Sequence, residues 1–344
     1  QTMMTPAIFS GIIISTILAT ASNSWLLAWL SLELNTLTVL PMISKTKHPR
    51  AIEAATKYFI TQAVASCLLL LAGTINAWLT GTWDITQMSN KFTSTITLIA
   101  LTMKIGTVPT HFWLPEVMQG STLLTALLIS TWQKIAPFSL MYLLANHTQP
   151  HIVLLLGLLS TTYGGWGGMN QTQLRKMMAY SSIASMGWAI IVLASDQMMS
   201  MVNIITYIII TTPTFLLMTL TSTKTLQNMT TMWTTSPLAA TMMTVLLLSA
   251  AGLPPLTGFL PKFIIMNELV NQNLTPTAAI TMATSLLSLS FYLRTAYLAT
   301  LLNSPGSATS STKWRQKTSN NKTMILSPTA ISSTPSLPTL LPWN

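Results

Sequence analysis

Long apolar runs separated by short polar stretches follow one another along the whole chain. A membrane-spanning helix needs about 20 mostly apolar residues. Membrane-barrel strands would instead alternate apolar and polar residues, and the runs here do not alternate. The pattern therefore predicts an all-α integral membrane protein of about eleven spans. The expected spans are 3–21, 24–44, 52–79, 92–119, 122–146, 150–169, 176–195, 198–220, 236–270, 276–301 and 324–342.

Two of these spans, 92–119 and 236–270, are too long for simple helices, and both contain Gly and Pro. Proline removes a backbone donor and clashes with the preceding turn, so we expect both helices to break near mid-membrane. A pair of interrupted spans, one in each half, is typical of the inverted repeats of transporters. We expect a single polytopic membrane domain, 1–344. Its expected parts are a repeat at roughly 24–146, a second at roughly 150–301, and a C-terminal loop with the last helix at 303–344.

Charged residues are scarce, and their distribution predicts the topology. The chain has 16 Lys and Arg and 6 Asp and Glu, which makes 6% charged residues, whereas a soluble domain has about 25%. Twelve of the 16 basic residues fall on the side of the membrane that holds the N-terminus, and only Lys91 falls on the other. By the positive-inside rule, the N-terminal side is cytoplasmic or matrix, and an odd span number puts the C-terminus opposite. The net charge of +10 is thus a topology signal, and we expect no nucleic-acid binding.

The remaining lysines, Lys104, Lys134 and Lys262, lie inside apolar segments, as does the acidic residue Glu33. A charge at the bilayer centre costs several kcal/mol or more, so such groups face the protein interior or internal water. Burial also lets them change protonation, which a proton relay requires. The alternative is a structural ion pair of Glu33 with one lysine, which leaves two lysines unexplained. His111 follows the first expected break and is a weaker relay candidate, since a neutral histidine could also fill a polar pocket.

Motifs for bound cofactors are missing from the sequence. It has no Walker motif, dinucleotide fingerprint or zinc-protease motif. Its single cysteine, Cys67, excludes an iron–sulfur site built from several cysteines of this chain. We therefore expect no NADH, flavin, ATP or redox metal to bind here.

Six segments carry a family resemblance: LELNTL at 32–37, HPR at 48–50, EAATKYF at 53–59, HFWLPEVMQG at 111–120, NQTQLRK at 170–176 and AGLPPLTGF at 251–259. With these motifs the chain resembles the subunit 2 family of respiratory complex I, the mitochondrial NADH:ubiquinone oxidoreductase. This is a family of antiporter-like subunits related to cation/proton antiporters. The resemblance extends from about residue 20 to 300 and implies a fold with inverted repeats.

The resemblance also implies a role for each buried charge. Glu33 matches the family's intramembrane glutamate, whose charge is thought to respond to a neighbouring pump unit. Lys104 matches the lysine of the first broken helix, which is the partner of that glutamate. Lys134 matches the bridging lysine, and Lys262 matches the lysine of the second broken helix.

Taken together, the resemblance implies a core membrane subunit of an H⁺-translocating NADH:ubiquinone reductase that contributes a proton channel. NADH, FMN, iron–sulfur clusters and ubiquinone are then expected in other subunits. The expected partners are other membrane-arm subunits, including neighbouring antiporter-like ones, and membrane lipids. The expected location is the mitochondrial inner membrane, with the N-terminus in the matrix and the C-terminus in the intermembrane space. Two alternatives stay open: a stand-alone cation/proton antiporter, and a structural membrane subunit that does not pump.

Overall fold

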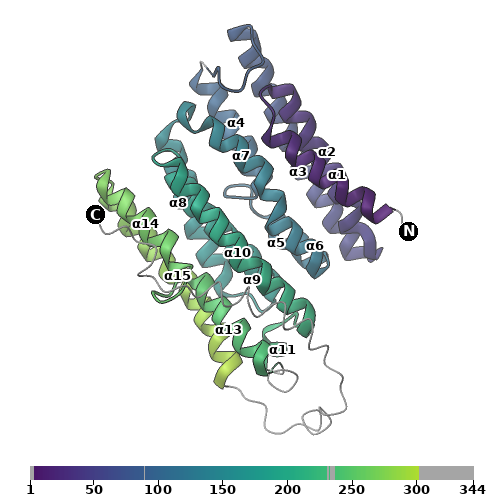
Figure 1. The fold of residues 1–344 in the computed structure, drawn as a ribbon, viewed down its shortest axis with the longest axis vertical. Helices are drawn as coiled ribbons and strands as arrows, with labels where there is room; N and C mark the ends of the chain where they lie inside the picture. Colours follow the sequence, from purple (N-terminus) through teal and green to yellow (C-terminus); the bar gives the residue numbers. More distant parts are fainter. Residues whose placement is uncertain (1–3, 89, 231, 233–236, 302–344) are drawn as a thin grey trace. The chain divides into compact units, whose positions relative to one another are not determined.

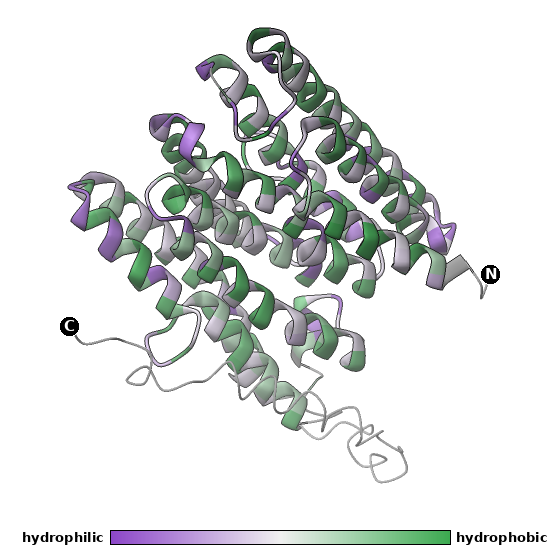
Figure 2. Ribbon diagram, turned by 45° about the horizontal axis from the view of Figure 1, so that its top comes forward, coloured by the Kyte–Doolittle hydropathy of each residue, from purple (hydrophilic) through white to green (hydrophobic). Residues whose placement is uncertain are grey.

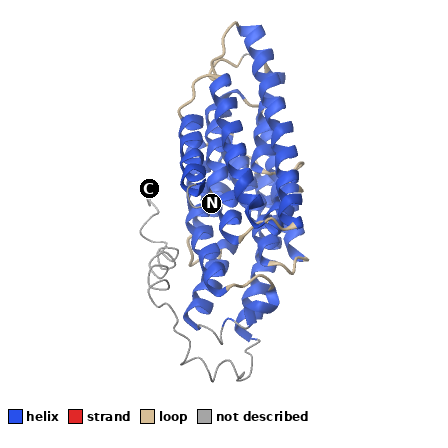
Figure 3. Cartoon of the chain, turned by 90° about the vertical axis from the view of Figure 1, so that its right-hand side faces the viewer, coloured by secondary structure: helices blue, strands red, loops and turns tan. Residues whose placement is uncertain are grey.

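The computed structural model describes residues 4–88, 90–230, 232 and 237–301, which form two compact units. Of these residues, unit 1 comprises those up to 160 together with 190–197, and unit 2 comprises 161–189 and those from 198 to 301. Within the described ranges the chain forms helices joined by loops and no extended strand (Figure 3). The predicted all-α class is therefore confirmed. The predicted loop at 303–323 and span at 324–342 lie outside the described residues.

Unit 1 contains seven complete α-helices among its described residues and the start of an eighth. They are α1 (Met4–Thr20), α2 (Trp25–Ile43), α3 (Pro49–Thr80), α4 (Lys91–Ile105), α5 (Trp113–Gly120), α6 (Leu123–Ser130), α7 (Ile135–Leu144) and the first half of α8 (Pro150–Met169). Three short 3₁₀ turns accompany them: η1 (Ser44–Thr46), η2 (Trp132–Lys134) and η3 (Ala145–His147). In Figure 1, α1, α2 and α3 lie side by side, and α3 also packs against α4 and α5.

Unit 2 takes up the rest of α8 and most of α9 (Leu174–Leu193). Its later elements are α10 (Gln197–Thr221), α11 (Leu226–Thr230), α13 (Pro237–Ala251), α14 (Phe259–Asn271) and α15 (Thr275–Leu301). The long helix α15 packs against α11, α13 and α14.

The lengths and surfaces of the helices fit a lipid environment. Six of the described helices are long and apolar enough to cross a membrane: Trp25–Thr46, Pro49–Thr80, Pro150–Met169, Leu174–Leu193, Gln197–Thr221 and Thr275–Thr300. Large apolar side chains such as Ile17, Ile60 and Leu286 are exposed. Figure 2 shows hydrophobic residues along most helices, with many hydrophilic stretches at their ends and turns. A soluble protein rarely exposes so much contiguous apolar surface. The number of spans in the whole chain stays a prediction.

Contacts between connecting segments agree with the predicted alternation of sides. Ser24, between the first two helices, forms an antiparallel bridge with Asp84, between the third and fourth. In unit 2, Gln173 forms the same kind of bridge with Thr225. Each bridge joins two segments that the span pattern assigns to one side of the membrane.

Both predicted helix breaks are present. Helix α4 ends just before Gly106, whose φ is +85°, and α5 begins only at Trp113. Helix α13 ends just before Gly252, whose φ is +84°, and α14 begins at Phe259. A left-handed residue after the last turn ends a helix, and glycine adopts this conformation without a Cβ penalty. The glycines therefore define the ends of the two half-helices.

A third interruption lies where the sequence predicted a continuous span, 122–146. Helix α6 ends before Thr131, η2 follows, and α7 begins at Ile135. Pro137 explains why the helix is interrupted here. It has no N–H to donate to the carbonyl of Gln133, and its ring crowds that carbonyl. The hydroxyl of Thr131 also donates to the Leu127 carbonyl at 2.7 Å, a local bond that competes with regular helix.

Candidate functional site

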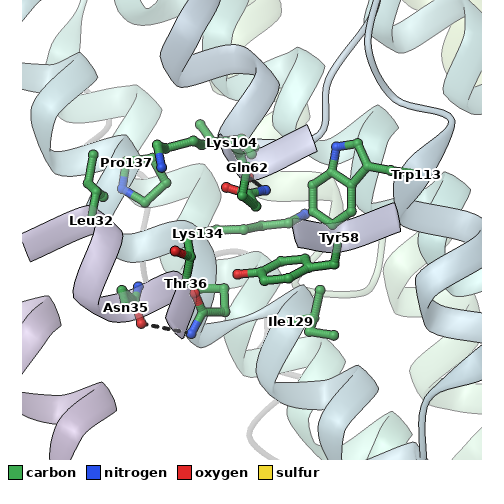
Figure 4. Close-up of a pocket in the computed structure, with 12 residues that line it drawn as sticks. Leu32, Asn35, Thr36, Tyr58, Gln62, Lys104, Trp113, Ile129, Lys134 and Pro137 are labelled. Carbon is green, nitrogen blue, oxygen red and sulfur yellow. Dashed lines mark hydrogen bonds between the residues drawn. The ribbon is translucent and has the colours of Figure 1, made fainter. Parts of the chain in front are cut away.

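Two of the predicted lysines line one small cavity in unit 1. Lys104, in the last turn of α4, is 7% exposed, and Lys134, at the end of η2, is 2% exposed. The other polar residues of the cavity wall are Asn35, Thr36, Tyr58, Gln62 and Gln133. In Figure 4, Lys104 points toward Pro137, and Lys134 extends beside the ring of Tyr58.

The size of this cavity suits water. The volume open to the centre of a water molecule is about 20 Å³. One water needs about 10–15 Å³ on this measure, together with two to four polar partners. The lysines and amides of the wall supply such partners. The cavity is thus suited to one or two hydrogen-bonded waters and too small for an organic substrate.

Helix α3 and the half-helix α5 satisfy the carbonyls that the first break exposes. Gln62 Nε2 donates to the carbonyl of Lys104 at 3.3 Å, and Trp113 Nε1 donates to the carbonyl of Met103 at 3.3 Å. The Tyr58 ring meets the Trp113 ring edge-on, with centroids 5.7 Å apart. The last carbonyls of a helix lack partners within the helix, so these two side chains stabilise its end.

A charged cluster at the start of α3 was not recognised in the sequence as a site. Lys57 Nζ lies 2.5 Å from Glu53 Oε1 and 2.6 Å from Glu116 Oε2. The first pair has the i,i+4 spacing of a helix, which a sequence can indicate. The second joins α3 to α5 and depends on the fold. Lys57 was interpreted only as a topology signal, and Glu116 was given no role.

Glu33 is partly buried on α2. Its Oε2 atom and the Nζ atom of Lys104 are buried without hydrogen-bond partners among the described residues. Glu33 forms no ion pair in the part of the chain that the structure describes. No hydrogen bond or ion pair therefore joins Glu33 and Lys104 in the described part of the chain.

Lys262 occupies the corresponding break in unit 2 in a different way. It lies on α14, after the break, and its Nζ donates to the carbonyl of Ala251 at 2.7 Å, before the break. It lines a cavity in which about 50 Å³ is open to the centre of a water molecule. Ser181, Asn203 and Tyr207 also line this cavity. Lys104, by contrast, lies before Gly106 at the first break, and the side chain of Gln62 donates to the Lys104 carbonyl.

The structure thus places three predicted residues, Glu33, Lys104 and Lys134, in one region of unit 1. Lys262 lies in unit 2. His111 lies in the loop between α4 and α5, is 4% exposed, and does not line the cavity of Lys104. Its ring lies against Phe112, with centroids 4.2 Å apart. Their roles in a relay stay predictions.

An amide pair in the cavity wall was also missed by sequence reasoning. Gln133 Nε2 donates to Asn35 Oδ1 at 3.0 Å, the dashed line in Figure 4. These residues are 98 positions apart, so no local spacing signals the contact. As for metals, no group of three or more His, Cys, Asp or Glu that could hold an ion occurs among the described residues.

Comparisons with known proteins agree with this architecture. Residues 22–288 match the family described as NADH:quinone oxidoreductase/Mrp antiporter. A relative from Tetraodon nigroviridis, NADH-ubiquinone oxidoreductase chain 2, is 44% identical over 98% of this chain and 97% of its own length. The protein of the same name from Carassius auratus is 49% identical over 90% of this chain and 89% of its own.

Solved structures show the same fold at low identity. A chain of respiratory complex I from Thermus thermophilus superposes with a TM-score of 0.80 at 23% identity, covering 94% of this chain and 77% of that one. A chain of the Mrp complex from a Dietzia species has a TM-score of 0.79 at 17% identity, covering 88% of this chain and 61% of that one. At these identities the likeness concerns the fold alone. On the match to the family and the identity to the curated relatives, the chain belongs to the NADH-ubiquinone oxidoreductase chain 2 family, within the NADH:quinone oxidoreductase/Mrp antiporter membrane proteins.

Proposed function

We propose that this chain is a core membrane subunit of mitochondrial NADH:ubiquinone oxidoreductase and that it contributes one proton-translocation pathway. The family of its relatives supports the first part. One observation carries the second: Lys104 and Lys134, both buried, share a water-sized cavity with five other polar side chains. Burying two lysines is costly, and a path for protons accounts for that cost better than packing does.

Glu33 controls the first lysine through its charge. A nearby carboxylate favours the protonated form of an amine. If Glu33 is neutralised or displaced, Lys104 loses this support. Because Lys104 has no direct ion-pair partner among the described residues that would have to separate first, it gives up its proton without a large movement.

The proton released by Lys104 passes through the cavity to Lys134 by way of bound water. The polar atoms of the wall hold the water in hydrogen-bonding positions. From Lys134 the proton continues toward Lys262, whose larger cavity also suits water. Uptake occurs on the side that holds the N-terminus, the matrix, and release occurs in the intermembrane space.

Electron transfer takes place in other subunits, which hold NADH, FMN, iron–sulfur clusters and ubiquinone. This chain has no role in the redox chemistry and binds none of these groups. Its partners are the neighbouring membrane-arm subunits, including other antiporter-like ones, together with lipids. The free energy of electron transfer reaches this chain as a conformational or electrostatic change, which such a neighbour passes on to Glu33.

The test is Lys134→Met in the assembled complex, because methionine keeps the length of the side chain and removes its charge. Assembly is checked by native electrophoresis, and NADH-driven proton transport and quinone reduction are measured in inner-membrane vesicles. Lys91→Met, at an exposed lysine at the start of α4, is the matched control. We expect assembled Lys134→Met complex to transport fewer protons per NADH, because this pathway is lost, while the control keeps the original ratio. Normal transport by assembled Lys134→Met complex would remove Lys134 from the pathway.

A further inference from the structure

The hydrogen bond between Asn35 and Gln133 connects two elements that the proposed pathway requires to act together. Asn35 lies on α2, two residues after Glu33, and is 3% exposed. Gln133 is partly buried and directly precedes Lys134 in η2. The distance from Gln133 Nε2 to Asn35 Oδ1 is 3.0 Å, and both side chains line the cavity of the two lysines.

The turn that carries Lys134 is held weakly by its own backbone. A 3₁₀ turn has poorer hydrogen-bond geometry than an α-helix. Here the bond from Lys134 N to the carbonyl of Thr131 measures 3.3 Å, near the long limit. Pro137 further denies the Gln133 carbonyl its normal helical donor. A hydrogen bond from outside the helix therefore adds to what holds this turn in place.

The Gln133 side chain forms that hydrogen bond with α2. An amide pair between buried or partly buried groups has a defined direction, whereas apolar packing between helices allows sliding. Breaking it from one side would leave the other amide without this partner in the cavity wall. The bond therefore fixes η2 relative to the helix that bears Glu33.

We propose that Asn35 and Gln133 form a positioning pair that transmits a change at the Glu33 helix to Lys134. The inference rests on the proposed proton pathway and adds a mechanical link to it. When α2 shifts in response to the charge of Glu33, the bond moves η2 with it, so that Lys134 reaches the cavity water in step with Lys104. Neither amide exchanges a proton with the pathway.

The experiment uses the assembled complex in inner-membrane vesicles and measures protons transported per NADH oxidised. Asn35→Leu and Gln133→Met keep the side-chain size and remove the bond. The reciprocal double variant, Asn35→Gln with Gln133→Asn, exchanges the two lengths and can remake it. Gln197→Met is the matched control, because it breaks a different amide pair of unit 1, Gln197 Nε2 to Asn146 Oδ1 at 2.9 Å.

We expect each single variant to assemble and to lower the number of protons transported per NADH by about as much as Lys134→Met does. The reciprocal variant should recover at least half of the lost protons per NADH. Gln197→Met should not change the number of protons transported per NADH. Since the ratio is measured per turnover, a smaller amount of assembled complex does not affect it. Recovery by the exchange distinguishes positioning from a general loss of packing.

Two results would overturn the inference. In the first, both single variants transport normally while Lys134→Met does not; the pathway then stands and the positioning pair fails. In the second, the single variants transport poorly and an assembled reciprocal variant recovers nothing. If the single variants do not assemble, the reciprocal variant decides alone: recovered assembly with normal transport supports the pair, and any other result rejects it. Normal transport by Lys134→Met would instead reject the proposed pathway itself.

Discussion

Gly106 allows a measurement of how tightly the first break is packed. Replacing it with alanine places a methyl group 2.8 Å from Leu114 Cδ1 and 3.0 Å from the Trp113 ring, while its φ of +85° stays left-handed. Gly81, at the end of α3, has a similar φ of +74°, but a Cβ there would meet nothing within 4 Å. Comparing Gly106→Ala with Gly81→Ala therefore separates two contributions to the loss of stability: the left-handed backbone and the overlap of the new methyl group with its neighbours.

The two costs can be estimated separately. A left-handed backbone costs a non-glycine residue about 1–2 kcal/mol. The lower entropy of the unfolded alanine chain offsets roughly 0.4–1 kcal/mol of this cost. Gly81→Ala should then cost about 1 kcal/mol. Overpacking adds about 1–3 kcal/mol at Gly106, since both ring and leucine are buried and the contact is closer than real Cβ contacts allow.

The assay heats the purified complex in steps and follows residual assembly by native electrophoresis. For a unit of this size, each kcal/mol lowers the midpoint by roughly 2–4 °C. We expect Gly106→Ala to lower the midpoint at least twice as far as Gly81→Ala. Because Gly106 follows Lys104 by two residues, Gly106→Ala should also reduce proton transport per NADH, and Gly81→Ala should not. Equal midpoints for the two variants would show that the half-helices are not closely packed at the break.

Three further variants test other contacts. Gln62→Leu leaves the carbonyl of Lys104 without its donor and should cost about 1 kcal/mol, seen as a lower midpoint on the same heating gel. Lys262→Met removes both the charge and the bond to Ala251, so transport should fall. Lys262→Arg keeps a charge and N–H donors but does not release its proton, so transport should fall as well, and normal transport by Lys262→Arg would contradict a relay role for Lys262. Lys57→Met leaves two carboxylates side by side at an exposed site, so its assembly yield should recover in high salt, and a salt-independent loss would contradict the role of charge.

The broken helices could be predicted because glycine and proline act locally. Gly106 and Gly252 stop their helices through their own backbone conformation, whatever surrounds them. The interruption before Lys134 was missed for a related reason. A single proline, Pro137, is compatible with either a kink or a continuous helix, and only the packing around η2 decides between them.

The buried charges could be found from the sequence because they contrast with apolar surroundings, and the structure buries Lys104 and Lys134 almost completely. Their neighbours could not be found this way. Asn35 and Gln133 are uncharged residues in a chain rich in polar uncharged side chains, and they meet across 98 positions. Glu116 was overlooked because a charge at the end of a span is normally solvated.

Lys262 forms its bond to the Ala251 carbonyl with an N–H that both forms of the side chain possess. An ammonium has three N–H groups and a neutral amine has two, so the bond at 2.7 Å survives the loss of a proton. The second break can therefore change its charge without losing the bond that ties its two half-helices together.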